Sequence, residues 1–257
     1  METLHIEIKE RLAVITLDRG RANALNTTML SELIAAVKDL DADENVAGLV
    51  ITGKENFFSA GVDLIELYGY NEDQSKEFWH TLLETVATLA AFKKPFVTSI
   101  TGHSPAGGCV IALCSDYRVM AKGEYIIGLN EVPVGIIVPE AIFHLYAFWL
   151  GSHKAYQYLL EGQLLKADAA LAEGLVDELA EPAQVFAIAE QKARGYMKLD
   201  ASTWQQTKLS IRGELLVKLQ ADNQATLDKM LAQWWSPATR AILKKMVDRL
   251  TNPVKSN

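Results

Sequence analysis

The sequence contains few of the residues that build metal and redox sites. Only two of its 257 residues are cysteine, Cys109 and Cys114, and both lie in an apolar segment that predicts a helix. Neither has a histidine nearby at metal-ligand spacing, and the chain has no CxxC, HExxH, P-loop or strand-linked GxGxxG motif. No sequence motif therefore indicates metal, nucleotide-triphosphate or nicotinamide chemistry. We predict no metal site and two buried free thiols.

Excess positive charge and long apolar runs are also lacking. The formal net charge is -7, from 25 Lys and Arg against 32 Asp and Glu, which argues against nucleic acid as a general partner. No apolar run approaches the ~20 residues of a membrane-spanning helix, so no membrane role is expected. The segment 1–8 leads directly into a strand-like alternation without a recognisable leader. We therefore expect a cytoplasmic chain, or a processed organellar form in the mitochondrial matrix.

Two turns rich in small residues are present, each between an apolar strand pattern and a helix pattern. Residues 59–62 (SAGV) follow the strand predicted at 48–53, and residues 105–108 (PAGG) follow the strand predicted at 96–100. Small residues let a backbone approach a ligand closely, and the first turn of a helix has N–H groups without intrahelical partners. Two such turns facing each other predict an oxyanion hole.

Three segments carry a family resemblance. FFSAGVDL (57–64), SPAGGCVIALCSDYRVMA (104–121) and YIIGLNEVPVGIIVPE (125–140) resemble, in order and spacing, the crotonase or enoyl-CoA hydratase/isomerase superfamily. The phrases CSDYRVMA and IGLNEVPVGII most resemble its mitochondrial-type Δ3,Δ2-enoyl-CoA isomerases. The resemblance implies an α/β fold with a crotonase-like spiral of ββα units over residues 1–195. An all-helical C-terminal oligomerisation region over 196–257 would follow.

The hydrophobic periodicity predicts alternating strands and helices before Pro139 and mostly helices after it. Strands are expected at 3–8, 12–18, 48–53, 96–100, 116–120, 125–128 and 175–179. Helices are expected at 27–40, 62–69, 74–92, 107–114, 140–150, 153–160, 166–173 and from 182 to the end. The periodicity alone does not reveal a spiral.

The resemblance implies catalytic roles at three positions. The N–H groups of Val62 and Gly107 would form the oxyanion hole, and Glu131 would be the general acid/base. Hydratases of the superfamily place a second glutamate where this chain has Val110. Hydration requires a water to be held and deprotonated, whereas one carboxylate suffices to move a proton from C2 to C4, and a valine helps to exclude water. We interpret the chain as an isomerase that shifts a 3-enoyl-CoA double bond to trans-2 in unsaturated fatty-acid β-oxidation.

The resemblance also implies contacts to the CoA part of the substrate, so no separate cofactor is expected. Most are backbone contacts in the loop after the strand at 12–18 and in the first turn: Ala22, Ala24, Ser59, Ala60, Asp63 and Leu64. The side chains of Arg19 and Arg21 are candidates for the pyrophosphate, although each alone is nearly as consistent with a solvated turn. For the side chains of Ser59 and Asp63 we favour a turn and a helix-cap role.

Apolar side chains after the second turn are candidates for the acyl pocket. We expect Val110 and Ile137 to line it, and the aromatic candidates are Phe92, Phe143, Phe148 and Trp149. His103 precedes the second turn, where we favour a local hydrogen bond over a role as base.

The C-terminal third implies an oligomer through the resemblance alone. In the family this region packs between subunits, which implies a homotrimer or a dimer of trimers. Apolar residues available for an interface are Trp204, Leu215, Leu216, Leu219, Met230, Trp234 and Trp235, and each is about equally consistent with intrachain core.

Two other functions remain open. One is another crotonase-type reaction on a CoA thioester, including weak enoyl-CoA hydration. The other is a non-catalytic acyl-CoA-binding protein. Glu131 separates an isomerase from a binding protein, because Glu131→Gln should abolish isomerisation but leave CoA affinity largely intact.

Overall fold

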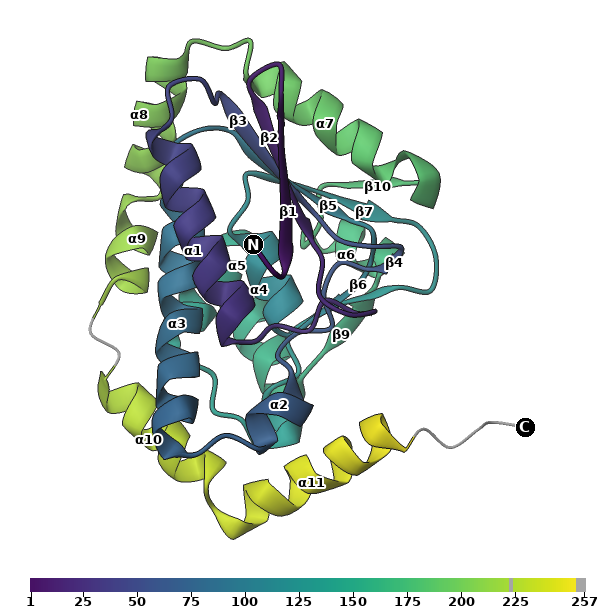
Figure 1. The fold of residues 1–257 in the computed structure, drawn as a ribbon, viewed down its shortest axis with the longest axis vertical. Helices are drawn as coiled ribbons and strands as arrows, with labels where there is room; N and C mark the ends of the chain where they lie inside the picture. Colours follow the sequence, from purple (N-terminus) through teal and green to yellow (C-terminus); the bar gives the residue numbers. More distant parts are fainter. Residues whose placement is uncertain (222–223, 253–257) are drawn as a thin grey trace.

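The structure is a computed structural model that describes residues 1–221 and 224–252 (Figure 1). Its strands are β1 (Leu4–Lys9), β2 (Leu12–Leu17), β3 (Gly48–Thr52), β4 (Asn56–Phe57), β5 (Phe96–Ile100), β6 (Gly102–Pro105), β7 (Tyr117–Ala121), β8 (Ile126–Gly128), β9 (Leu164–Lys166) and β10 (Glu178–Ala180). Its α-helices are α1 (Thr27–Ala42), α2 (Leu64–Tyr68), α3 (Glu72–Ala90), α4 (Gly107–Leu113), α5 (Glu140–Glu161), α6 (Ala167–Ala172), α7 (Val185–Tyr196), α8 (Ala201–Ile211), α9 (Gly213–Leu219), α10 (Gln224–Trp234) and α11 (Pro237–Thr251). Two 3-10 turns are η1 (Val132–Val134) and η2 (Pro182–Gln184).

The strands form two sheets, and the chain passes repeatedly from the first sheet to the second. The first has the order β1-β2-β3-β5-β7-β10, in which β1 and β2 are an antiparallel hairpin and the other neighbours are parallel. The second has the order β4-β6-β8-β9, in which only β9 is antiparallel. The pairs β3–β4, β5–β6 and β7–β8 each place one strand in each sheet. This repetition confirms the predicted spiral, whereas the hairpin β1–β2 stays within the first sheet.

The first sheet is covered by helices on both faces. Successive strand residues point to opposite faces, so Val50 and Val97 pack toward α7, while their neighbours Ile51 and Phe96 enter the main core. Figure 1 shows α7 on one side of this sheet and α1 and α3 on the other. Every residue of β3 and β5 is buried, as expected of central parallel strands between helices.

The C-terminal helices pack on helices of the preceding region. Contacts join α9 to α3 and α5, and α10 to α3. Leu215, Leu219, Met230 and Trp234 are buried within the chain, so assigning them to an intersubunit surface is wrong. The remaining three residues of that set are half-buried: Trp204, Leu216 and Trp235. The proposed division of the chain at residue 195 stays a prediction.

Most predicted elements lie within a few residues of their observed positions, and the differences are local. The short strands β4, β6 and β9 were not predicted, because two to four residues do not display a period. The predicted helices at 140–150 and 153–160 are the two parts of α5, interrupted at Gly151 with φ 74° and ψ 154°. Within the described ranges, no helix is long and apolar enough to cross a membrane.

Candidate active site

The first turn is held by the loop that follows β2. The Leu25 N–H donates to the Gly61 carbonyl, and the Leu25 carbonyl accepts the Asp63 N–H, both at 2.8 Å. Leu25 thus pairs with the backbone on either side of Val62 and leaves the Val62 N–H outside the ladder. Fully buried Ser59 supports the turn from below, because its Oγ accepts the Gly61 N–H at 3.1 Å. The preferred turn role of the Ser59 side chain is confirmed.

The second turn leads from β6 into α4. Ala106 has φ 50° and ψ -123°, a conformation that strains a residue carrying a Cβ. Its N–H donates to the Gly128 carbonyl at 2.8 Å, which ties the turn to the strand that leads to Glu131. Gly107 follows as the first residue of α4, where the helix provides no acceptor for its N–H. Among residues 1–221 and 224–252, neither the Val62 nor the Gly107 N–H donates to a protein group.

The two turns are in direct contact. A Cβ on Gly61 would lie 2.9 Å from the Ala106 Cβ and 3.2 Å from the Gly107 nitrogen. A Cβ on Gly107 would lie 2.7 Å from Leu25 Cδ1 and 3.6 Å from the Val62 nitrogen. A Cβ at Gly61 therefore does not fit unless a turn moves, and a Cβ at Gly107 requires the Leu25 side chain to shift. This contact brings two free N–H groups to adjoining positions, as an oxyanion hole requires.

Glu131 follows β8 and begins the turn of η1. Its carbonyl accepts the N–H groups of Val134 at 3.1 Å and Ile136 at 3.0 Å, so its backbone is fixed. The residue as a whole is half-buried, but its Oε2 is fully buried and has no hydrogen-bond partner in the described part of the chain. Burial raises the pKa of Glu131 to about 7, against the lowering effect of nearby backbone N–H groups. A carboxylate with this pKa suits general acid/base work near neutral pH.

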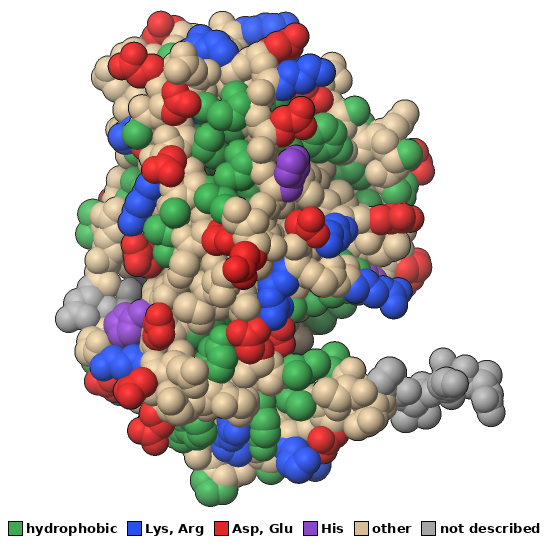
Figure 2. Space-filling view, in the orientation of Figure 1, with side chains coloured by type: hydrophobic (Ala, Val, Ile, Leu, Met, Phe, Trp, Pro, Cys, Tyr) green, Lys and Arg blue, Asp and Glu red, His purple; other side chains and the backbone are tan. Residues whose placement is uncertain are grey.

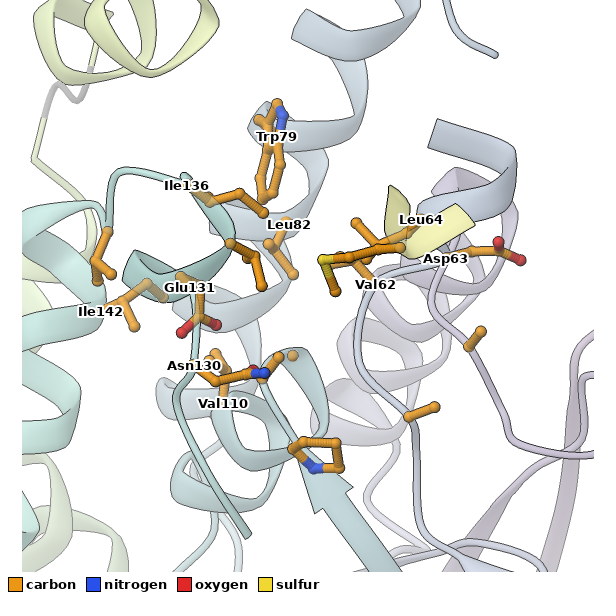
Figure 3. Close-up of a pocket in the computed structure, with 18 of the residues that line it drawn as sticks. Val62, Asp63, Leu64, Trp79, Leu82, Val110, Asn130, Glu131, Ile136 and Ile142 are labelled. Atoms are coloured by element: carbon orange, nitrogen blue, oxygen red, sulfur yellow. The ribbon is translucent and has the colours of Figure 1, made fainter. Parts of the chain in front are cut away.

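A cavity of about 390 Å³ joins the two turns to Glu131. Figure 3 shows Glu131 and Val62 on opposite sides of the cavity, with Asn130 and Val110 below Glu131. Apart from Asp63, Asn130 and Glu131, the residues that line the cavity are apolar or glycine. The apolar lining accounts for the raised pKa of Glu131.

Asp63 is not available as a second base. Its Oδ2 lies 2.7 Å from Arg19 Nη1, and its Oδ1 accepts the Glu66 N–H at 3.0 Å. Figure 3 shows its carboxylate turned away from Glu131. The favoured helix-cap role of this side chain is confirmed, since Asp63 caps α2. Glu131 is thus the only lining carboxylate in the described chain that is free to exchange a proton with a bound ligand.

The family follows from the sequence match. The sequence model described as "Enoyl-CoA hydratase/isomerase" matches residues 7–240. The chain belongs to the enoyl-CoA hydratase/isomerase family. The predicted crotonase superfamily membership, with its isomerase-like character, is confirmed by this match and by the relatives that follow.

Relatives of this family member include both named activities. Mitochondrial enoyl-CoA delta isomerase 1 of Mus musculus is 35% identical over 214 residues, which are 82% of this chain and 72% of the mouse protein. A probable enoyl-CoA hydratase of Rhizobium meliloti (strain 1021) is 32% identical over 182 residues, 70% of each chain. The crystal structure of human mitochondrial delta3-delta2-enoyl-CoA isomerase has a TM-score of 0.92 at 28% identity, covering 97% of this chain and 98% of that chain.

The structure of this enoyl-CoA hydratase/isomerase family member brings most of the predicted site residues to one cavity. The predicted residues that line it are Ala22, Ala24, Ala60, Val62, Asp63, Leu64, Gly107, Val110 and Glu131. Ser59 lies beneath the first turn and does not line the cavity. Arg19 is held by two carboxylates, Asp63 at 2.7 Å and Glu66 at 2.6 Å, and Arg21 is exposed outside the cavity. Contacts of both arginines with CoA stay predictions.

The prediction that Ile137 lines the acyl pocket is wrong. Ile136 lines the cavity and is 6% exposed, whereas Ile137 is 38% exposed and lines only an adjoining groove, which Ile136 also borders. The chain has no regular secondary structure at residues 136–139, so the direction of each side chain is set by local packing. The aromatic candidates also lie elsewhere: Phe92 is in the core, Phe143 is on the groove of Ile137, and Phe148 and Trp149 are on a groove beside α8.

Several cavity residues were missed by sequence reasoning, among them four on the helices α3 and α11. Trp79 and Leu82 of α3 lie with Ile136 above Glu131 in Figure 3, and Met246 and Leu250 come from α11. The apolar spacing of α3 indicates a buried helix face, but it does not show which side chains border a cavity. The two α11 residues had no local signal, because only the packing of the distant helix brings them to the site.

His103 and the cysteines have structural roles. His103 Nδ1 accepts the Ile126 N–H at 3.3 Å, and its ring contacts Phe57 and Tyr125, so the predicted local hydrogen bond is confirmed. Both cysteines are buried and free. Burial raises the thiol pKa of Cys109 and Cys114, which keeps both thiols protonated. In the described residues, no cluster of side chains could hold a metal ion.

Proposed function

We propose that this protein is a Δ3,Δ2-enoyl-CoA isomerase of unsaturated fatty-acid β-oxidation. The observation that carries the proposal is the pairing of Glu131 with Val110 in one cavity, where a hydratase of the superfamily has a second glutamate. A valine holds no water. A single carboxylate in an apolar cavity supports proton movement along a bound chain better than addition of water.

The proposed reaction uses Glu131 for both proton transfers. The Glu131 carboxylate removes a C2 proton from the 3-enoyl thioester, and the negative charge moves to the thioester oxygen. The N–H groups of Val62 and Gly107 stabilise that oxygen, since both lack protein acceptors within the described chain. The Glu131 carboxylic acid then returns the proton to C4, which leaves the double bond between C2 and C3. Atoms and charge balance without a further reactant.

The CoA part of the substrate would lie along the loop after β2 and the first turn. Ala22, Ala24 and Ala60 line that end of the cavity, and their small side chains leave room for an extended arm. Arg21 is the exposed cation of this loop and is our candidate for the pyrophosphate. We propose that the reaction uses no cofactor other than the CoA carried by the substrate.

Turnover of trans-3-hexenoyl-CoA tests the proposal. We expect purified protein to produce conjugated 2-enoyl thioester, seen as rising absorbance, and to leave trans-2-hexenoyl-CoA largely unhydrated. Glu131→Gln keeps the size of the side chain but removes the base, so the isomerisation rate should fall by about 10²–10⁴-fold. Glu140→Gln is a matched control, because Glu140 is an exposed glutamate at the start of α5.

The alternatives give different results in the same assays. Rapid loss of trans-2-hexenoyl-CoA would show a hydratase and would contradict the interpretation of Val110. Absence of turnover with retained affinity for hexanoyl-CoA would favour a binding protein. Equal activity of wild type and Glu131→Gln would exclude Glu131 as the base.

We also propose that the protein assembles as a homotrimer or a dimer of trimers. Apolar side chains of the helical region remain exposed on the single chain, among them Leu199, Ile211 and Val217. Such exposed apolar surface is typical of an interface. Analytical ultracentrifugation measures the mass directly, and a monomer at micromolar concentration would contradict this expectation.

A further inference from the structure

The helix α11 forms one wall of the Glu131 cavity. It contacts both α2 and η1, the elements that follow the first turn and Glu131, respectively. Two of its side chains, Met246 and Leu250, line the cavity. Figure 1 shows α11 as an outlying helix below α2, and Figure 2 shows hydrophobic side chains where α11 meets the body of the molecule. The cavity is therefore closed on this side by a helix from the far end of the chain.

Specific contacts fix the start of α11 in this position. Arg240 donates from Nη2 to the Tyr68 carbonyl at 2.8 Å, and its guanidinium lies 3.6 Å from the centre of the Tyr68 ring. Thr239 is buried, and its Oγ1 lies 3.4 Å from the Gly135 carbonyl. These contacts attach the helix to the end of α2 and to the loop after η1. Met246 and Leu250 are thus held in place by the fold.

These two side chains lie outside the part of the chain that the family match covers. That match ends at residue 240, whereas the two cavity residues of α11 are at positions 246 and 250. The chemistry expected from the family depends on Val62, Gly107 and Glu131, all within the match. The wall formed by α11 therefore lies outside the segment that the family model matches.

The two residues occupy different depths. Leu250 lines the cavity although it is 56% exposed, so it lies at the opening, whereas Met246 is half-buried. The oxyanion turns and Glu131 locate C1 to C4 of a bound thioester. The carbons beyond C4 must use the remaining apolar lining, which includes Trp79, Leu82 and Met246. A long, flexible methionine side chain at that wall limits the space for the chain.

We propose that Met246 sets the length of the unbranched acyl chain that the site accepts, with α11 as the outer wall of the acyl pocket. This inference rests on the proposed function, because it places the thioester at the two turns and Glu131. Met246→Ala removes three heavy atoms from the wall and creates room for additional methylene groups. Each methylene that becomes buried improves kcat/KM by about fourfold.

The experiment compares trans-3-enoyl-CoA substrates of 6, 8, 10 and 12 acyl carbons. For Met246→Ala, we expect kcat/KM of the 10-carbon substrate relative to the 6-carbon one to rise at least about tenfold over wild type. Met246→Phe should shift the preference toward the shorter substrates. Val247→Ala is the matched control, because Val247 is the neighbouring half-buried residue of α11 and does not line the cavity.

Binding of saturated acyl-CoAs of the same lengths, measured by calorimetry, separates this inference from the proposed function. These ligands have no double bond to move, so a shifted length preference in Met246→Ala supports the role of Met246 even if no isomerisation is seen. An unchanged length preference in both Met246 variants would overturn the inference. An equal change for all lengths and for acetyl-CoA would also overturn it, because Met246 would then contact the CoA arm.

Discussion

Glu131 and Asp116 are two buried carboxylates in opposite situations. Asp116 lies between α4 and β7, and its side chain is 10% exposed. Its Oδ2 accepts Lys208 Nζ at 2.7 Å and the Phe96 N–H at 2.8 Å, and its Oδ1 lies 3.1 Å from Arg212 Nη2. Arg212 also donates to three main-chain carbonyls at the ends of α3 and α4. Asp116 therefore joins the C-terminal helices to the core, while Glu131 Oε2 has no partner in the described chain.

The electrostatic difference explains the difference in role. Burial raises the pKa of Glu131 to about 7, and no cation opposes the rise. Burial also lowers the pKa of Lys208 to about 8, but the charge of Asp116 opposes that change. Asp116 thus partly offsets the effect of burial on the Lys208 cation, whereas no cation offsets the effect of burial on Glu131. An unpartnered carboxylate weakens the folded state at neutral pH, and in return it exchanges a proton readily.

Removing the charge of Asp116 should have the largest effect on stability. Asp116→Asn leaves the cations of Lys208 and Arg212 buried without their carboxylate, so we expect a loss of about 3–5 kcal/mol in the free energy of unfolding. Chemical denaturation measures the change. Glu84→Gln is the control, because the pair of Glu84 with Lys38 is exposed and should contribute less than about 1 kcal/mol. If Asp116→Asn lost no more free energy of unfolding than the control, the proposed structural role of this cluster would be contradicted.

Gly61→Ala should disrupt the oxyanion turns while leaving Glu131 intact. The new Cβ would meet the Ala106 Cβ at 2.9 Å and the Pro105 carbonyl oxygen at 3.0 Å, which forces the turns apart. Loss of one oxyanion donor lowers kcat by about 10²–10³-fold. Gly174→Ala is the matched control, since Gly174 has φ +76° but open space around its Cβ position. If both variants lost activity equally, backbone strain alone would account for the effect.

Glu131→Gln should stabilise the protein at pH 8 as it removes the activity. The unfolded carboxyl releases its proton near pH 4.5 and the folded one near pH 7. The Glu131 carboxyl therefore costs no stability below pH 4.5, where it is protonated in both states. Its contribution to the free energy of unfolding falls as the pH rises and reaches its lowest value above pH 7. Glu131→Gln should match wild type near pH 4.5 and exceed its unfolding free energy by up to about 3 kcal/mol at pH 8.

Denaturation curves at pH 4.5, 6, 7 and 8 measure this difference. Glu55→Gln provides the reference, because Glu55 is exposed. A pH-independent difference between wild type and Glu131→Gln would show that the carboxyl is not destabilised by burial.

The fold was predictable where the apolar period extends over a whole element. The five residues of β3 form a mostly apolar run, and all are buried. The apolar residues of α1 recur at helical spacing, and they are the residues buried in the structure. In both elements the apolar pattern of the sequence was enough for the prediction. The two-residue β4 has no such period, and its place depends on pairing with β6. The exchange of strands between two sheets was available only through the family resemblance.

The candidate site was predictable where its geometry is local. Gly61 and Gly107 are recognisable because a turn beside a helix start requires small residues, whereas Glu131 was singled out only through the family resemblance. Ile137 was placed in the cavity and Ile136 was overlooked, because the segment after Gly135 is irregular and the direction of its side chains depends on what packs around it. Met246 was missed for the same reason, since only the docking of α11 brings it to the cavity.

The smallest expected effect is a shift in the pH profile when Glu131 is given a hydrogen-bond donor. The carboxylate would then have a partner, as that of Asp116 has. For wild type, kcat/KM should rise about tenfold between pH 6 and pH 8, because proton removal requires the ionised form of a group with a pKa of about 7. Val110→Thr keeps the shape of the side chain and adds a hydroxyl beside the cavity wall. A hydrogen bond to the carboxylate favours its charged form, so the midpoint of the pH profile should fall by part of a unit.

Val119→Thr is the control for this comparison, because Val119 is fully buried in the core against α7 and does not line the cavity. It should lower stability without moving the pH profile. A midpoint that stays in place for Val110→Thr would mean that the new hydroxyl does not reach the carboxylate. A midpoint that falls, together with faster hydration of trans-2-hexenoyl-CoA, would show that an apolar residue at position 110 both raises the basicity of Glu131 and keeps water from the double bond.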